Sequence, residues 1–158
     1  MFYNCLHKLH TLDLGGLDIT NVGLNYINDI KQLKVLSLSG TAITDDGLEQ
    51  LKGLPKLQML YLSDNNITDN GLTCLKELNQ LQSLYLDNTN ITDAGLVYLK
   101  GLNQLSSLNL SNTNVTDSGL VHLKGLPKAS WIILKNTKVT DTGVQDLKKA
   151  LPSLHIER

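Results

Sequence analysis

The sequence predicts an α/β solenoid, a stack of similar units in which a short strand alternates with a short helix. The first observation is repetition: the stretch "LSLSGTAITDDGLEQLKGLPK" at 36–56 returns three times, each time 24 positions later and with few changes. The second is that the spacing of the apolar residues changes once within every period, from alternation to steps of five and three. A fixed period of this length is typical of units that bury their apolar faces only by stacking on their neighbours.

The chain of 158 residues is expected to form a single domain built from these units. We expect a partial unit at 1–8, six repeats, and a closing strand at 151–158 that places Leu151, Leu154 and Ile156 in the same L-x-x-L-x-L frame as the earlier strands. No recognisable polar cap covers the first repeat, which suggests a piece of a larger protein. The six repeats run over 9–32, 33–56, 57–80, 81–104, 105–128 and 129–150.

The first part of each unit predicts a strand with one buried face. In "LQSLYL" at 81–86, apolar and variable residues alternate, so that Leu84 and Leu86 are expected to point into the core. The neighbouring side chains of Ser83, Tyr85 and Asp87 are expected to point outward. Every unit runs in the same direction along the stack, and successive strands are therefore predicted to pair in parallel.

The second part of each unit, for example "ITDAGLVYLKGL" at 91–102, suits a short helical segment laid against the strands. Thr92 stands where an N-cap belongs, and Asp93 follows in the first turn, where a carboxylate favours the positive end of a helix. Gly95 lowers helix propensity, so we expect it to permit close approach between neighbouring units. The first repeat carries Thr20–Asn21 in place of the Thr-Asp pair.

The strand motif L-x-x-L-x-L-x-x-N resembles that of the leucine-rich repeat family over nearly the whole chain, and "ITDxGLxxL" is similar to repeats of F-box-associated ligase subunits and of bacterial leucine-rich repeat proteins. The resemblance implies a curved parallel sheet on the concave face and short helices on the convex face. Asn65 keeps the asparagine that in this family bonds the backbone inside the turn. Threonine is expected to replace it with weaker bonding at Thr41, Thr89, Thr113 and Thr137.

Charge and hydropathy give no indication of a nucleic-acid or membrane partner. The chain carries 14 basic and 15 acidic residues, although the part from Lys124 onward has a net charge of +4 and the part before it a net charge of −5. No apolar run approaches the roughly 20 residues needed to cross a bilayer, and the first residues lack the features of a secretory signal. The sequence therefore predicts a soluble protein and favours a cytoplasmic one.

The sequence offers no constellation typical of an enzyme, a metal site or a cofactor site. The four histidines are scattered over different units without zinc-ligand spacing. Cys5 and Cys74 lie almost three units apart, about 14 Å at the spacing of strands, which excludes a disulfide between them. We expect Cys74 to be a free, buried thiol.

The variable residues of the strands are predicted to form a protein-binding surface, because the repeated leucines are committed to the core. Two clusters with aromatic side chains are expected on the concave sheet, one of Met59, Tyr61 and Tyr85 and one of Trp131 and Ile133. Exposed aromatics are typical of interface hot spots. The alternative is that the tyrosines serve cross-strand packing and that the Trp131 cluster shields the end of the sheet. The predicted residues are Val35, Met59, Tyr61, Asp64, Tyr85, Asp87, Asn109, Trp131, Ile133 and Lys135.

These features together predict a non-catalytic scaffold that binds a protein partner on its concave sheet, most simply as a monomer. Three alternatives remain open. The segment is the targeting module of a larger enzyme, such as a ubiquitin ligase or a secreted bacterial effector. It is an architectural segment that associates end to end through its sheet edges. Or its concave aromatics stack against carbohydrate.

Overall fold

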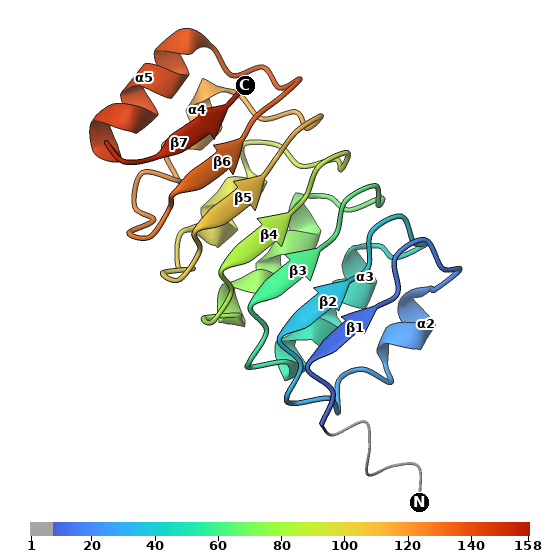
Figure 1. The fold of residues 1–158 in the computed structure, drawn as a ribbon. Helices are drawn as coiled ribbons and strands as arrows, with labels where there is room; N and C mark the ends of the chain where they lie inside the picture. Colours follow the sequence, from blue (N-terminus) through green and yellow to red (C-terminus); the bar gives the residue numbers. More distant parts are fainter. Residues whose placement is uncertain (1–7) are drawn as a thin grey trace, which may run out of the picture.

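The computed structural model describes residues 8–158, and Cys5 lies outside that part of the chain. Seven strands form one parallel sheet whose spatial order is the order of the sequence (Figure 1). Each strand pairs with the residues 24 positions before and after it, so that Leu60 stands between Leu36 and Leu84. The strands are β1 (Thr11–Asp13), β2 (Val35–Ser37), β3 (Met59–Tyr61), β4 (Ser83–Tyr85), β5 (Ser107–Asn109), β6 (Trp131–Ile133) and β7 (His155–Glu157).

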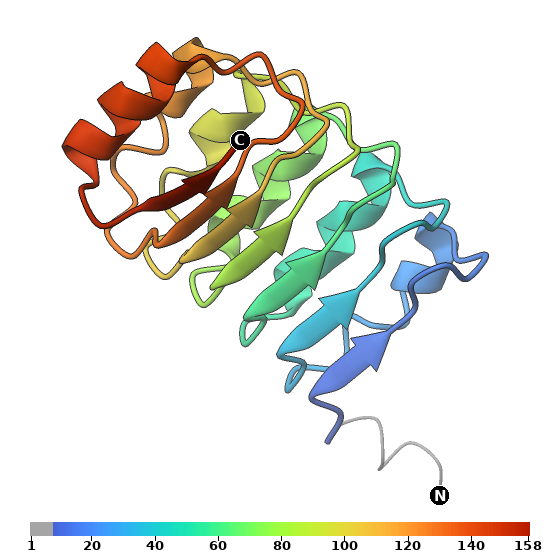
Figure 2. The same ribbon diagram turned by 45° about the horizontal axis from the view of Figure 1, so that its top comes forward.

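Short helices form a second layer behind the sheet, which confirms the predicted alternation of strands and helices (Figure 2). Most of these segments are a single turn of α-helix or a 3₁₀ helix (η), because each unit has room for about two turns before the chain must return to the next strand. They are α2 (Asn21–Leu24), α3 (Asp45–Leu48), η1 (Glu49–Gly53), η2 (Asp69–Glu77), η3 (Gly95–Leu99), α4 (Asp117–Leu120) and α5 (Asp141–Ala150).

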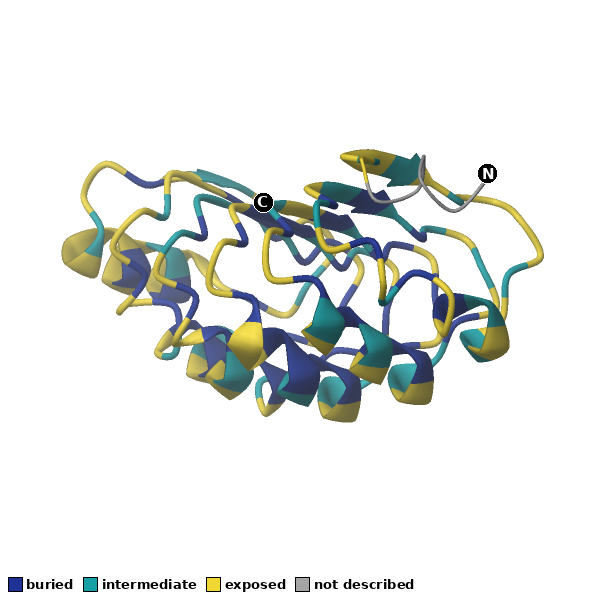
Figure 3. Ribbon diagram, turned by 90° about the horizontal axis from the view of Figure 1, so that it is seen from below, coloured by how far each residue is buried: buried dark blue, intermediate teal, exposed yellow. Residues whose placement is uncertain are grey.

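The core is a continuous column of leucine and isoleucine between the two layers (Figure 3). In a middle unit, Leu84 and Leu86 from the strand segment and Leu96 and Leu99 from the helix are fully buried. Burial of one such side chain stabilises the fold by about 1.5–3 kcal/mol, and each unit contributes several. Cys74 is a free, buried cysteine within this column, as predicted.

A seventh strand forms within 151–158, but the frame predicted for it, with Leu151, Leu154 and Ile156, is wrong by two positions. The strand β7 pairs Ile156 with Ile132 and His155 with Trp131, so the period of 24 positions continues to the end of the sheet. The physical reason is the length of α5, which continues to Ala150. Leu151 therefore ends that helix, its N–H bonding the carbonyl of Leu147, instead of opening a new unit.

The aspartate of the repeated Thr-Asp pair has a role beyond the predicted one. It lies in the first turn of its own helix at Asp45, Asp69 and Asp117, as expected, and it also bonds the next unit. Asp69 Oδ1 accepts a hydrogen bond from the backbone N–H of Thr92 at 2.8 Å, and Asp69 Oδ2 accepts one from the hydroxyl of Thr92 at 2.6 Å. We call this arrangement the aspartate clasp. It recurs in the pairs Asp45–Thr68, Asp93–Thr116 and Asp117–Thr140.

The predicted caps form only in part. Thr68, Thr116 and Thr140 accept a bond from an N–H of the first turn, whereas the side chains of Thr20 and Thr44 do not cap their helices. A helix of one turn has a small dipole, so the carboxylate gains more from two hydrogen bonds to the next unit than from its own helix end.

Asn65 performs the predicted role inside the turn. Its Nδ2 donates to the carbonyl oxygens of Leu38 at 2.7 Å and Leu62 at 3.1 Å, and its Oδ1 accepts from the N–H of Thr41 at 3.0 Å. Where threonine replaces this asparagine, the hydroxyl bonds a carbonyl of its own unit, as Thr113 does with Leu110 at 2.6 Å. Asparagine thus links two units at this position, and threonine closes one turn.

Candidate protein-binding surface

The first and third residues of every strand form two rows on the open face of the sheet. Neighbouring strands pair these residues directly, so equivalent side chains stand about 4.8 Å apart. Seven of the ten predicted binding residues lie in these rows. The first row consists of Thr11, Val35, Met59, Ser83, Ser107, Trp131 and His155, and the second of Asp13, Ser37, Tyr61, Tyr85, Asn109, Ile133 and Glu157.

Tyr61 and Tyr85 stack on each other in the second row. Their ring centroids are 4.6 Å apart and the ring planes differ by 9°. Cross-strand aromatic pairs stabilise a sheet, so the stack provides the packing that the alternative interpretation expects. Both side chains are half-buried, and the paired rings form a stiff apolar ridge beside the exposed side chain of Met59.

Trp131 is 42% exposed, and its ring lies 4.6 Å from that of His155 in a tilted arrangement. The predicted site does not include His155. Its place follows from a step of 24 positions from Trp131, but the predicted frame of the closing strand put it two positions away from that place. His155 covers one side of the tryptophan ring, and the other side faces the middle of the sheet.

Two hollows flank the tyrosine ridge. The larger, about 470 Å³, is lined by Tyr85, Ser107, Ser130, Trp131 and Ile133. It lies over the small Ser107 of β5, between Trp131 at the same level of β6 and Tyr85 in the second row of β4. The second, about 290 Å³, lies on the other side of Tyr61. Its lining is Thr11, Leu12, Asp13, Val35, Ser37 and Tyr61.

Asp87 and Asn109 are tied to their neighbours by a polar chain above the sheet. Asp87 Oδ1 accepts bonds from the hydroxyl of Ser63 at 2.7 Å and from Nδ2 of Asn109 at 2.9 Å. Asn109 Oδ1 in turn accepts from the N–H of Ser111 at 3.0 Å. The chain holds both side chains in fixed positions, and none of these bonds uses Asp87 Oδ2.

Asp64 and Lys135 lie beyond the strands, at the edge of the predicted site. Asp64 is exposed and has a φ of 58°, the left-handed conformation that Asp and Asn tolerate better than other side chains with a Cβ. Asn88, at the equivalent turn, has a φ of 56°. The turn alone explains the residue type at Asp64. Lys135 pairs with Glu157 at 2.6 Å, an exposed ion pair of small energetic weight.

One carboxylate of the second row has a shifted pKa. The N–H of Gly15 and the hydroxyl of Ser37 both donate to Asp13 and lower the pKa of its carboxyl from the ordinary value. Asp13 therefore stays charged at the border of the smaller hollow.

The part of the chain that the structure describes contains no cluster of three or more His, Cys, Asp or Glu side chains that could hold a metal ion. Burial raises the pKa of Cys74 to about 12, so this thiol is neither a thiolate nucleophile nor a thiolate ligand near neutral pH. Among residues 8–158, no helix is long and apolar enough to cross a membrane.

Family models for leucine-rich repeats match this chain over three stretches: one over residues 7–67, a model of two repeat copies over 55–93, and a third over 102–123. No curated protein matches the chain.

Two solved structures of internalins from Listeria monocytogenes resemble the whole solenoid. Internalin InlF superimposes with a TM-score of 0.69 at 25% identity, covering 96% of this chain and 48% of the internalin. Internalin C2 gives a TM-score of 0.66 at 28% identity, covering 96% of this chain and 71% of the internalin. The chain thus spans about half the length of the first internalin.

Proposed function

Because the chain belongs to the leucine-rich repeat family, we propose that its concave sheet binds a protein partner and that this segment catalyses no reaction. Repeats of this family typically mediate protein binding, and the two internalins share the fold. The comparisons name no partner for this chain. They also give no support to the expectation of a cytoplasmic protein.

The observation that carries the proposal is the tyrosine ridge between two hollows. A partner that lays an extended segment across the strands meets the stacked rings of Tyr61 and Tyr85 first, and places side chains into the hollows on either side. Aromatic side chains bury a large area at a small cost in rotamer entropy. The stack is already formed in the free protein, which reduces that cost further.

The second cluster extends the same surface toward the closing strand. Trp131 and Ile133 line the larger hollow on the side opposite Tyr85, so one bound side chain contacts both predicted clusters. The two clusters are therefore expected to act as a single binding site instead of two.

We test the proposal with the variant Tyr61→Ala plus Tyr85→Ala against the matched variant Tyr26→Ala. Tyr26 lies on the convex side and is 79% exposed, so its loss removes an exposed tyrosine without touching the sheet. Both variants are compared with the native chain in a capture experiment from lysate, with mass spectrometry. The affinity of the identified partner is then measured by calorimetry on variants shown to be folded.

We expect the double variant to lose about 2 kcal/mol or more of binding free energy, the loss that defines a hot spot, and Tyr26→Ala to bind like the native chain. Equal capture by the double variant and the native chain would contradict the proposal. In that case the rings serve only the cross-strand packing that their stacking already provides.

A further inference from the structure

Charge is segregated between the two halves of every unit. We define the outgoing half as the strand together with the path to the helix start, twelve residues in all, as in 59–70. The return half is the following twelve residues back to the next strand, as in 71–82. The return halves, with residues 8–10, contain eleven of the thirteen lysines and four carboxylates. The outgoing halves, with residues 155–158, contain eleven carboxylates and three basic residues.

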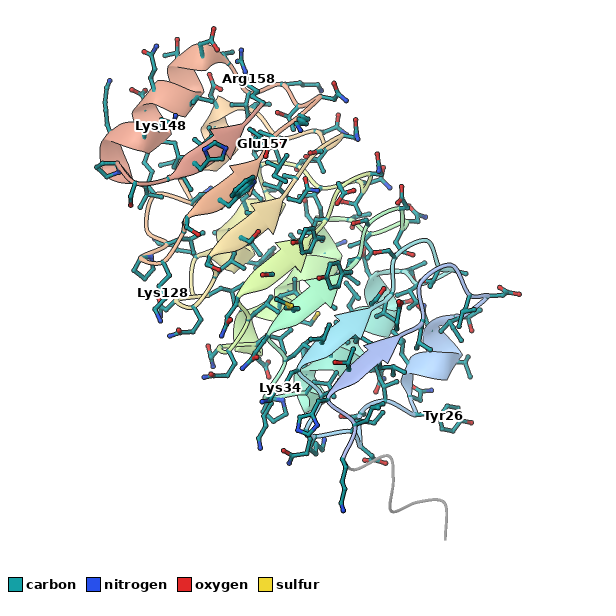
Figure 4. The ribbon with its side chains drawn as sticks, in the orientation of Figure 1. Tyr26, Lys34, Lys128, Lys148, Glu157 and Arg158 are labelled. Carbon is teal, nitrogen blue, oxygen red and sulfur yellow. The ribbon has the colours of Figure 1, made fainter. Side chains whose placement is uncertain are left out.

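The lysines of the return halves form what we call the lysine border. All of them are exposed, and of the eleven only Lys52 and Lys149 form an ion pair in the part of the chain that the structure describes. Figure 4 shows Lys34 and Lys128 on the side of the molecule where the strands begin, with Lys148 further along on α5. The border consists of Lys8, Lys31, Lys34, Lys52, Lys56, Lys76, Lys100, Lys124, Lys128, Lys148 and Lys149.

All seven glutamines of the chain also lie in the return halves. Two lysines and two glutamines line a hollow of about 380 Å³ near the start of the strands: Lys34, Lys56, Gln58 and Gln80. The ammonium of Lys56 bonds Gln32 at 2.6 Å, and that of Lys128 bonds Gln104 at 2.6 Å. Primary amides both donate and accept hydrogen bonds, so this surface offers positive charge together with partners for hydroxyl groups.

We propose that the lysine border binds a linear anionic polysaccharide, with its centre at the hollow of Lys34, Lys56, Gln58 and Gln80. Five of the lysines recur every 24 positions and therefore form a row over successive units, which matches a chain that carries an acidic group on every one or two sugars: Lys52, Lys76, Lys100, Lys124 and Lys148. The amides of Gln58 and Gln80 can donate hydrogen bonds to the sugar hydroxyls between those acidic groups and accept bonds from them. This surface is separate from the concave rows.

Three other occupants fit the border less well. Single-stranded nucleic acid binds on aromatic platforms, and Tyr26 is the only exposed tyrosine, tryptophan or phenylalanine of the return halves among the described residues. An anionic bilayer needs only charge and exposed apolar groups, which leaves the glutamines without a function. Of the eleven outgoing carboxylates of a second copy, four are committed to the aspartate clasps, as Asp69 is with Thr92, and four more bond within their own chain: Asp13, Asp87, Asp141 and Glu157.

The test uses size-graded oligosaccharides, heparin-derived for sulfate groups and alginate-derived for carboxylate groups, with calorimetry on the intact chain. Lys34→Gln plus Lys56→Gln is expected to weaken binding on the order of 25-fold, at about 1 kcal/mol for each lysine near an anionic surface. Lys138→Gln changes one charge in an outgoing half and is expected to leave affinity unchanged, whereas Lys34→Gln alone costs about fivefold.

The decisive variant is Gln58→Ala plus Gln80→Ala, which alters no charge. We expect it to weaken oligosaccharide binding by at least about threefold, because hydrogen bonds to the sugar are lost, and to leave the binding of inorganic polyphosphate unchanged. Equal loss for both ligands, or no loss for either, would overturn the proposal. So would tighter binding of an oligonucleotide of equal charge, retention on anionic vesicles without binding of oligosaccharides, or self-association in light scattering that the lysine substitutions abolish.

Discussion

At the scale of single residues, the repeated polar residues outside the core form hydrogen bonds from one unit to the next. The aspartate clasp joins residues 23 positions apart, and Asn65 joins its turn to that of the preceding unit. The glycine three residues after each clasp threonine faces the clasp aspartate and is required by the same contact. A Cβ on Gly95 would lie far inside van der Waals contact with Asp69 Oδ1. This confirms that Gly95 permits close approach between neighbouring units.

The contact at Gly95 gives a first prediction. Gly95→Ala is expected to displace Asp69 and break its bonds to Thr92, lowering the free energy of unfolding by about 1–3 kcal/mol. Urea denaturation measures the change. The matched control is Gly101→Ala in the same unit, where no atom lies within 4 Å of the added Cβ. That variant should be neutral or slightly more stable, and a loss equal to that of Gly95→Ala would contradict the prediction.

A second prediction concerns pH. The hydroxyl and the N–H of Thr140 lower the pKa of Asp117 below its ordinary value. A carboxyl whose pKa is lower in the folded chain binds fewer protons than in the unfolded chain. Its contribution to stability is therefore present above the unfolded pKa of about 4 and is lost as the pH falls through the folded value.

Asn21 shows which variant can test this pH effect. Its Oδ1 accepts from the N–H of Thr44 at 3.0 Å and its Nδ2 donates to the hydroxyl at 2.9 Å, so an amide also forms the clasp. Asp117→Asn should keep the clasp with Thr140 and reduce the loss of stability between pH 6 and pH 3, measured by urea denaturation. An unchanged pH profile would show that Asp117 contributes nothing to it.

At the scale of elements, each strand is defined by its neighbours more than by its own three residues. A strand of that length has no stability alone and persists because it pairs on both sides and buries one face. The strand β7 extends this arrangement: it pairs with β6, places His155 against Trp131, and brings Glu157 to Lys135. Without it, β6 becomes an open edge with a large apolar side chain.

Removal of residues 155–158 tests the role of β7. We expect a lower Tm and more aggregation, because β6 then offers unpaired backbone groups to other chains. Thermal unfolding followed by circular dichroism, together with light scattering, measures both effects. Glu157→Gln is the control: it removes the exposed ion pair with Lys135 and is expected to change stability by less than about 1 kcal/mol. A truncated chain as stable as the native one would show that α5 alone closes the stack.

At the scale of the whole molecule, contacts between neighbouring units stabilise the fold. Positive and negative charges gather in different halves of each unit. The difference between −5 and +4 along the chain is smaller than the difference across it, where the return halves carry a net charge of +7 and the outgoing halves one of −8. Aligning the charged residues by their position within the 24-residue repeat would have revealed that segregation from the sequence. A comparison of the net charge of the N-terminal part with that of the C-terminal part does not show it.

The nearest-neighbour character of the stack gives the last prediction. Leu84→Ala, in the middle of the sheet, is expected to cost about 2–5 kcal/mol, because the side chain is fully buried between two units. Leu12→Ala removes the equivalent leucine of β1, which is only partly buried, and should cost clearly less. Denaturant unfolding measures both values. Equal losses at the two positions would mean that the solenoid does not follow a nearest-neighbour description.

The resemblance to the leucine-rich repeat family indicated the role of Asn65, and the sequence by itself determined the rest of the fold: the period, the parallel order of the strands and the leucine column. These follow because one unit, repeated, has a single way to bury its apolar face. The period also places equivalent variable residues such as Tyr61 and Tyr85 side by side, and only the tertiary structure decided how their side chains contact each other. The stacked tyrosines, the tilted pair of Trp131 and His155, and the link of Asp87 to Ser63 and Asn109 join residues 22 to 24 positions apart. Such contacts depend on the side-chain conformations of two units at once, and no single unit of the sequence specifies them.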